Sequence, residues 1–154
     1  MAKEIKSIIF EKYILFTIIT LAVILLDQLV KWDIKKRSLN LPGPVIENFL
    51  SITNIHNYGA SFGMLQNRPA LLAWFSIFVV VLIFAFLGRA DRKISIFLAM
   101  ILGGTVSNLV DRISYGYVID YVDFSFWPAF NIADAALTVG VIVLFVVIWR
   151  SEFK

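Results

Sequence analysis

Four long uncharged runs dominate the hydrophobic pattern of this chain. They hold 14, 20, 17 and 15 residues, at 13–26, 69–88, 94–110 and 135–149. A helix needs roughly 17–25 apolar residues to cross the hydrocarbon core of a bilayer. The first run gains length from Leu29, Val30 and Trp32, and the last from residues that begin near Pro128. The pattern therefore predicts four transmembrane helices, at roughly 13–32, 69–88, 94–111 and 128–149.

The segment between the first two predicted spans, roughly 38–67, has a different pattern. It opens with the turn residues Pro42-Gly43-Pro44 and continues into FLSITNI at 49–55, which is rich in β-branched residues. Such a stretch favours one or two short strands. We expect a small β-containing platform that rests on the membrane surface.

An even number of spans places both termini on one side of the membrane. That side holds 8 of the 14 basic residues, against 6 on the other side. Cytoplasmic loops carry an excess of Lys and Arg, so this count predicts cytoplasmic termini. Seven polar residues at the other span ends are expected at the opposite, extracytoplasmic face. They are Asp27, Lys31, Asn57, Asn108, Asp111, Arg112 and Asp134.

Composition supports a membrane protein and narrows the chemistry. The 154 residues are 60% hydrophobic and 16% charged, with a mean hydropathy of +0.84, whereas soluble domains average about 25% charged residues. This length predicts a single membrane-embedded domain over 1–154. The net charge of +3 comes without a basic stripe among stacking aromatic residues, so we expect contacts with anionic lipids and not with nucleic acid.

Nucleophilic and metal-dependent sites have little support in this composition. The chain has no cysteine and one histidine, His56. A serine–histidine system would depend on His56 alone, and a zinc site would have only carboxylates beside it. Paired aspartates remain. Two neighbouring carboxylates share one proton, so the ionised member can activate water while the protonated member polarises a carbonyl. This chemistry needs no cofactor and no metal.

Five aspartates near the extracytoplasmic face are candidates for such a pair. Asp27 lies four residues before Lys31, a helical spacing that favours a structural ion pair. Asp111 adjoins Arg112, and neighbouring residues on a helix point in different directions, so each is expected to meet a different partner. Asp123 is expected on an exposed loop, without a function.

Asp120 and Asp134 are the remaining two aspartates. Asp134 is expected on the first turns of the last span, on the same helical face as Asn131, where a helix N-terminus favours negative charge. We interpret Asp120 and Asp134 as a catalytic pair. The alternative, a set of structural polar contacts between helices, stays open on this reasoning.

Five blocks of the sequence together resemble the lipoprotein signal peptidase (signal peptidase II) family, in the family's order. They are DQLVK at 27–31, NYGASFG at 57–63, GGTVSNLVDR at 103–112, GYVIDYVDF at 116–124 and FNIAD at 130–134. The resemblance implies an all-α membrane protein of four helices, with a small extracytoplasmic β-cradle and a mobile extracytoplasmic loop that closes over the substrate.

The resemblance also implies an activity and a site. The enzyme would be a multi-pass aspartyl endopeptidase of the bacterial inner membrane, monomeric and without a cofactor or metal, with its site near the extracytoplasmic face. It would cut prolipoproteins on the N-terminal side of a diacylglyceryl-modified cysteine. The catalytic residues would be Asp120 and Asp134. The residues that support the site or bind substrate would be Asp27, Lys31, Asn57, Gly59, Asn108, Asp111, Arg112 and Asn131.

Three positions depart from the family's usual pattern. Ser107 stands where the family usually has Gly, Thr105 where a smaller Ala is common, and Ser61 in place of a second Ala. All three residues are small, so we expect them to affect helix packing and not the chemistry.

Two other classes of protein would also place aspartates in a membrane. A proton- or ion-coupled transporter holds them near the midplane, within broken helices and inverted repeats. A noncatalytic assembly protein would have no reason to gather them at one face. The one-sided placement and the absence of a visible repeat favour the peptidase.

Overall fold

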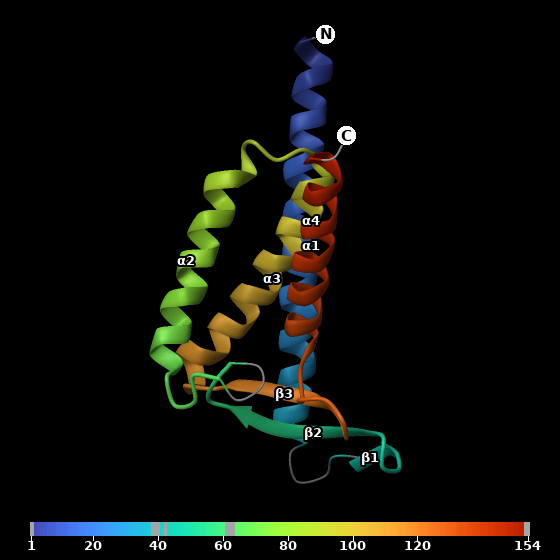
Figure 1. Ribbon diagram of the computed structural model, residues 1–154, viewed down its shortest axis with the longest axis vertical. Helices are drawn as coiled ribbons and strands as arrows, with labels where there is room; N and C mark the ends of the chain where they lie inside the picture. The colour runs from blue at the N-terminus through green and yellow to red at the C-terminus, as the bar shows by residue number, and fades with distance from the viewer. Residues whose placement is uncertain (1, 38–40, 42, 61–63, 153–154) are drawn as a thin grey trace.

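A computed structural model describes residues 2–37, 41, 43–60 and 64–152, with side chains described from residue 9 to residue 150 within those ranges. The elements run in the order α1 (Ala2–Lys36), β1 (Gly43–Ile46), β2 (Leu50–Asn57), α2 (Pro69–Leu87), α3 (Arg92–Tyr115), β3 (Val118–Phe124) and α4 (Ile132–Glu152). The four helices form a bundle, and the strands form a small sheet across one end of it (Figure 1).

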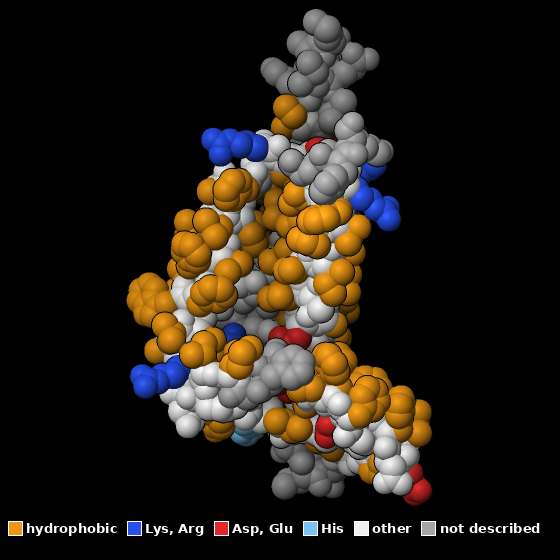
Figure 2. All heavy atoms as spheres, viewed as in Figure 1, with side chains coloured by type: hydrophobic (Ala, Val, Ile, Leu, Met, Phe, Trp, Pro, Cys, Tyr) orange, Lys and Arg blue, Asp and Glu red, His pale blue; other side chains and the backbone are white. Residues whose placement is uncertain are grey.

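All four helices are long and apolar enough to cross a membrane. Their outward surfaces are hydrophobic: Phe78 of α2 is 56% exposed, and Phe145 of α4 is 62% exposed. Figure 2 shows these side chains covering the flanks of the bundle, with basic side chains at its ends. A hydrophobic surface of this kind is stable only in contact with lipid. The predicted four-helix membrane fold is confirmed.

The helix boundaries follow from residues that end or start helices. α1 extends beyond the predicted 13–32 because Ala2–Lys36 contains no Gly or Pro. Pro69 starts α2 at a position where its missing N–H costs nothing. Asp91 caps α3 by accepting the Ile94 N–H at 2.8 Å. Gly116 ends α3 with a φ of 78°, a left-handed conformation that turns the chain directly into β3.

α3 forms the centre of the bundle and packs against α1, α2 and α4. Two glycines permit its closest approaches. A Cβ on Gly103 would lie 2.7 Å from Val23 Cβ of α1, and one on Gly104 would lie 2.3 Å from the Ala133 carbonyl oxygen of α4. The second approach is important for the site, because it brings the first turn of α4 against the polar end of α3.

The sheet has the antiparallel order β1-β2-β3. Ile55 pairs with Asp120 and Asn57 with Val118, and the β2–β3 register shifts between Ile52 and Ile55. The predicted strands of the first loop are present. Part of that loop, including Pro42 and Ser61, lies outside the described residues.

Two expectations for the segment before α4 were wrong. Residues 118–124 form a third strand, which was not predicted although VIDYVDF is rich in β-branched and aromatic residues. α4 begins at Ile132 and not near Pro128, because Phe130 pairs with Val122 and keeps the preceding chain extended. Residues 125–129 form a short described connection, and the mobile loop stays a prediction.

Candidate active site

The polar residues predicted from four separate segments meet where the sheet closes one end of the helix bundle. Asp120 comes from β3, Asp134 from the first turn of α4, Asn57 from the end of β2 and Asn108 from the last turns of α3. Asp120 is 2% exposed and Asn108 is 5% exposed. The fold thus brings buried carboxylates and amides to one place.

Asn131 holds both aspartates of the predicted pair. Its Nδ2 donates to Asp120 Oδ1 at 2.8 Å. Its Oδ1 accepts the Asp134 N–H at 2.8 Å, and its own N–H donates to Asp134 Oδ2 at 3.3 Å. This reciprocal exchange is a capping box. Asn131 is therefore the cap of α4, and the expectation that it lies on the first turns of the helix was wrong. Asn131 therefore contacts the Asp120 carboxylate through its side chain and the Asp134 carboxylate through its backbone N–H, so one residue links the two carboxylates.

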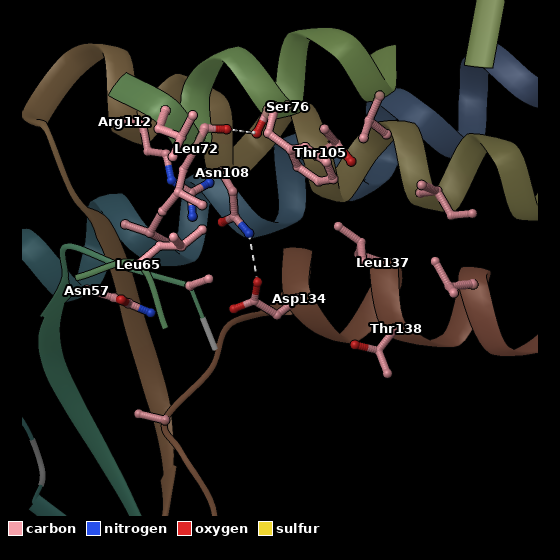
Figure 3. Close-up of a pocket in the computed structure, with 18 residues that line it drawn as sticks. Asn57, Leu65, Leu72, Ser76, Thr105, Asn108, Arg112, Asp134, Leu137 and Thr138 are labelled. Carbon is pink, nitrogen blue, oxygen red and sulfur yellow. Dashed lines mark hydrogen bonds between the residues drawn. The ribbon is translucent and has the colours of Figure 1, made fainter. Parts of the chain in front are cut away.

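Each aspartate has a second amide donor from another element. Asn57 Nδ2 donates to Asp120 Oδ2 at 2.9 Å. Asn108 Nδ2 donates to Asp134 Oδ1 at 2.8 Å, the contact drawn in Figure 3. Neutral amides orient a carboxylate without neutralising it. Both side chains are therefore held in place while one of them can still carry a proton.

The environment of Asp120 favours its protonated form. Burial and, after it, the neighbouring Asp134 charge raise the pKa of Asp120 to about 7, although the hydrogen bonds from Asn57 and Asn131 and the charge of Lys31 act in the opposite direction. A carboxyl group with a pKa near neutrality can hold a proton and release it during a reaction.

A separate buried ion cluster lies behind the pair. Lys31 Nζ contacts Asp27 Oδ2 at 2.6 Å and Asp111 Oδ2 at 2.8 Å, and it donates to Asn108 Oδ1 at 2.9 Å. The ion pair predicted from the spacing of Asp27 and Lys31 is present. Asp27 and Asp111 are both 0% exposed, so their carboxylates lie within the protein and support the site from inside.

Arg112 has a different partner from Asp111, as predicted. Its Nη2 donates to the Gly59 carbonyl oxygen at 3.4 Å, and the Gly59 N–H donates to Asn57 Oδ1 at 2.9 Å. A Cβ on Gly59 would lie 2.7 Å from the Met64 carbonyl oxygen. Gly59 therefore allows the loop after β2 to fold tightly and to orient Asn57 toward Asp120.

Three residues of this network were not among the predicted site residues. Tyr121 Oη donates to Asp27 Oδ1 at 3.1 Å. Ser107 Oγ donates to Asp27 Oδ2 at 2.7 Å. Gln28 Nε2 donates to Ser107 Oγ at 3.0 Å and to Asp111 Oδ1 at 2.9 Å. We expected Ser107 to affect only helix packing, but its hydroxyl also takes part in this hydrogen-bond network. All three stand inside or beside the sequence blocks noted above, and that proximity was their only signal.

Three further residues singled out from the sequence are Asp123, His56 and Thr105. Asp123 lies in β3 opposite Ser51 and is half-buried, so the exposed loop expected for it was wrong. His56 lies in β2, and its ring stacks on Tyr117 at 4.0 Å between centroids. Within the described part of the chain, the buried Thr105 hydroxyl has no hydrogen-bond partner.

A cavity of about 670 Å³ opens beside Asp134, between α2, α3 and α4. Its polar end is formed by Asn57, Asn108, Arg112 and Asp134, and its walls by apolar residues that include Leu72, Phe75 and Leu137 (Figure 3). Figure 2 shows the surface hollowed in this region, with acidic and basic atoms at the lower end. Among the described residues, no group of three or more His, Cys, Asp or Glu is placed to hold a metal ion.

Comparisons with known proteins agree on one family. The model of the family described as signal peptidase (SPase) II matches residues 19–150. Two proteins named lipoprotein signal peptidase are similar to this chain. The one from Halothermothrix orenii is 37% identical over 88% of this chain and 95% of its own length. The one from Caldanaerobacter subterraneus subsp. tengcongensis is 40% identical over 82% of this chain and 90% of its own length.

A solved structure is also similar to this fold. A bacterial membrane enzyme determined by the in meso method at 2.3 Å resolution superposes with a TM-score of 0.80 and 27% sequence identity. The match covers 89% of this chain and 88% of that one.

Proposed function

Because the chain belongs to the signal peptidase II family, whose members release signal peptides from prolipoproteins, we propose that Asp120 and Asp134 are its catalytic pair. One observation carries the assignment: Asn131 contacts the carboxylates of both aspartates. In addition, Asp134 lines an apolar cavity between the helices. Family membership also removes support from the transporter and assembly-protein alternatives.

The proposed reaction is addition of water to the peptide carbonyl. We assign the shared proton to Asp120, whose pKa burial and the Asp134 charge raise to about 7. Its O–H donates to the carbonyl oxygen of the substrate, while ionised Asp134 takes a proton from water. The hydroxide adds to the carbonyl carbon. As the C–N bond breaks, a carboxyl proton passes to the leaving nitrogen, and the pair returns to its singly protonated state.

Asn57 and Arg112 have separate roles in this proposal. The Asn57 amide covers Asp120 Oδ2, so a substrate carbonyl that approaches Asp120 would replace that hydrogen bond. The Arg112 guanidinium lines the cavity beside Asp134. It would stabilise negative charge on the tetrahedral intermediate. The buried cluster of Asp27, Lys31 and Asp111 keeps Asn108 oriented toward Asp134.

The cavity supports recognition of a lipid-modified substrate. Its walls are apolar, from Leu71, Leu72, Phe75 and Val79 of α2 to Leu137 of α4, and they continue into the hydrophobic flanks of the bundle. Acyl chains bound there would place a modified cysteine beside Asp134. Binding energy from a remote group can then position the scissile bond for attack. We propose cleavage on the N-terminal side of a diacylglyceryl-modified cysteine.

Cleavage assays with matched precursors test this proposal. The purified protein is incubated with a diacylglyceryl-modified prolipoprotein and with the same precursor lacking the lipid, and the released signal peptide is measured. We expect kcat/KM to be at least about tenfold higher for the modified precursor, which corresponds to about 1.4 kcal/mol in the transition state. Equal rates for the two precursors would refute lipid recognition, and cleavage of neither would refute the function.

We further propose that the termini are cytoplasmic and that the sheet lies at the extracytoplasmic membrane surface. The two ends of the chain lie at the end of the bundle away from the sheet (Figure 1). The sheet region exposes apolar side chains, including Phe49 at 44% and Phe126 at 70%, which would enter the lipid headgroup layer. The helix bundle and the sheet pack against each other, and we propose that they form one peptidase domain that acts as a monomer.

Single cysteines test this orientation, because the natural chain has none. Glu47 is exposed in the turn between β1 and β2, and Gly88 is exposed between α2 and α3. In protoplasts we expect a membrane-impermeant maleimide to label Glu47→Cys. It should label Gly88→Cys only after the membrane is permeabilised. The reverse pattern would place the site on the cytoplasmic side.

A further inference from the structure

Tyr121 follows Asp120 directly on β3, but the two side chains leave opposite faces of the strand. Asp120 meets Asn57 and Asn131, whereas Tyr121 extends into the interior toward α1 and is 3% exposed. Tyr121 is also absent from the lining of the cavity beside Asp134. Tyr121 can therefore influence the site only through contacts in the protein interior and not through contact with a substrate in the cavity.

The Tyr121 hydroxyl connects three elements. It donates to Asp27 Oδ1 of α1 at 3.1 Å and accepts the Ile132 N–H of α4 at 2.9 Å. The Ala133 N–H donates to the same Asp27 oxygen at 3.1 Å. Ile132 and Ala133 are the two residues immediately before Asp134. The first N–H groups of α4, which have no partner within the helix, are thus held by Tyr121 and Asp27.

The Asp27 carboxylate that makes these contacts is itself held in place by other residues. Its other oxygen is held by Lys31 at 2.6 Å and by Ser107 at 2.7 Å, and its side chain is 0% exposed. Burial raises the pKa of Tyr121, and the Asp27 charge acts in the same direction, so the hydroxyl keeps its proton and donates it to this carboxylate. The first turn of α4 is consequently tied to the ion cluster on α1.

This path also connects the two aspartates of the proposed pair. From Asp120 it runs through one peptide bond to Tyr121, across the hydroxyl to Ile132, and along two residues to Asp134. Asn131 provides the direct contact between the pair, but Asn131 belongs to the same turn of chain as Ile132. A displacement of that turn would move Asn131 and Asp134 together, away from Asp120.

We propose that Tyr121 is a positioning residue, whose hydroxyl anchors the first turn of α4 to Asp27 and so keeps Asp134 in place beside Asp120. This inference rests on the proposed catalytic pair for its kinetic consequence. The anchoring itself is a property of the fold and can be measured without activity.

Tyr121→Phe tests the proposal, because it removes the hydroxyl and keeps the ring. Tyr117→Phe is the matched control, since Tyr117 stands just before the same strand but its ring stacks on His56. Hydrogen exchange is followed by mass spectrometry over a peptide that covers 130–136. We expect the Ile132 and Ala133 amides to exchange at least about tenfold faster in Tyr121→Phe and at the wild-type rate in Tyr117→Phe.

Kinetics on a lipid-modified prolipoprotein provide the second measurement. We expect kcat of Tyr121→Phe to fall about 10- to 100-fold with little change in KM, because a misplaced catalytic group affects the transition state and not substrate binding. The alkaline limb of its kcat profile should move to lower pH, because a more distant Asp134 raises the pKa of Asp120 less. Loss of folded protein alone would lower kcat without moving this limb.

Each outcome of the exchange and kinetic measurements supports or overturns the proposed role of Tyr121. Wild-type exchange in Tyr121→Phe would overturn the anchoring, and faster exchange with unchanged kcat would overturn the role of Tyr121 in positioning Asp134. If the wild type fails to cleave prolipoprotein, the proposed function is lost while the exchange result still decides the anchoring. If Tyr121→Phe does not fold, 3-fluorotyrosine at this position replaces it. Its weaker acceptor oxygen should speed exchange of the Ile132 amide, and an unchanged rate would overturn the proposal.

Discussion

Asp134→Asn and Asp120→Asn are each expected to lower kcat for prolipoprotein cleavage by at least about 10³-fold. Asparagine nearly matches the shape of aspartate and can keep part of the hydrogen bonding with Asn57, Asn108 and Asn131. It cannot take a proton from water, and it cannot pass one to a leaving nitrogen. The loss should therefore appear in a protein that still folds and binds substrate.

Asp123→Asn is the matched control for both variants. Asp123 lies on the same strand as Asp120, is half-buried and pairs with Ser51 away from the cavity. Its replacement is expected to change kcat less than about threefold. The double variant at 120 and 134 should lose no more activity than either single variant, because the two carboxylates act as one unit. Wild-type activity in either single variant would refute the catalytic pair.

Lys31→Met is expected to destabilise the protein by about 3–5 kcal/mol, the cost of leaving buried charge without its partner. Lys31 is 2% exposed and contacts two carboxylates that are themselves fully buried, those of Asp27 and Asp111. Methionine fills similar space and removes the only ammonium that these carboxylates contact in the described residues. The free energy of unfolding in detergent measures the loss.

Two companion variants separate charge from packing. Lys36→Met, on an exposed position of the same helix, should cost less than about 1 kcal/mol. Lys31→Met combined with Asp111→Asn removes one charge of each sign, so it should recover part of the stability that Lys31→Met loses. If the double variant is less stable than Lys31→Met alone, the loss comes from packing and the buried-charge explanation is wrong.

Contacts within one helix could be predicted well from the sequence, and contacts across elements could not. The spacing of Asp27 and Lys31 predicts their ion pair, because four residues make one turn of helix. The same reasoning put Asn131 on the first turns of the last helix, because Pro128 was taken to lie inside it. Pairing of Phe130 with Val122 delays the helix and makes Asn131 its cap.

The third strand shows why the site itself needed the fold. Asp120 meets Asn57, 63 residues earlier in the chain, only because Ile55 pairs with Asp120 in the β2–β3 ladder. A shift of one residue in that register would turn Asp120 to the other face of the sheet. Tyr121 meets Asp27 across 94 residues for the same reason. Nothing in the local pattern specifies either partner.

The sequence by itself determined the four spans and the gathering of the polar residues at one end of them, because long uncharged runs favour helices in lipid and the polar residues fall at the ends of those runs. Only the tertiary structure decided which polar residues touch. The close approach of α3 to α4 at Gly104, the β2–β3 register and the cap at Asn131 together bring Asp120 and Asp134 to one amide. These are packing relations between distant segments, which no periodicity along the chain records.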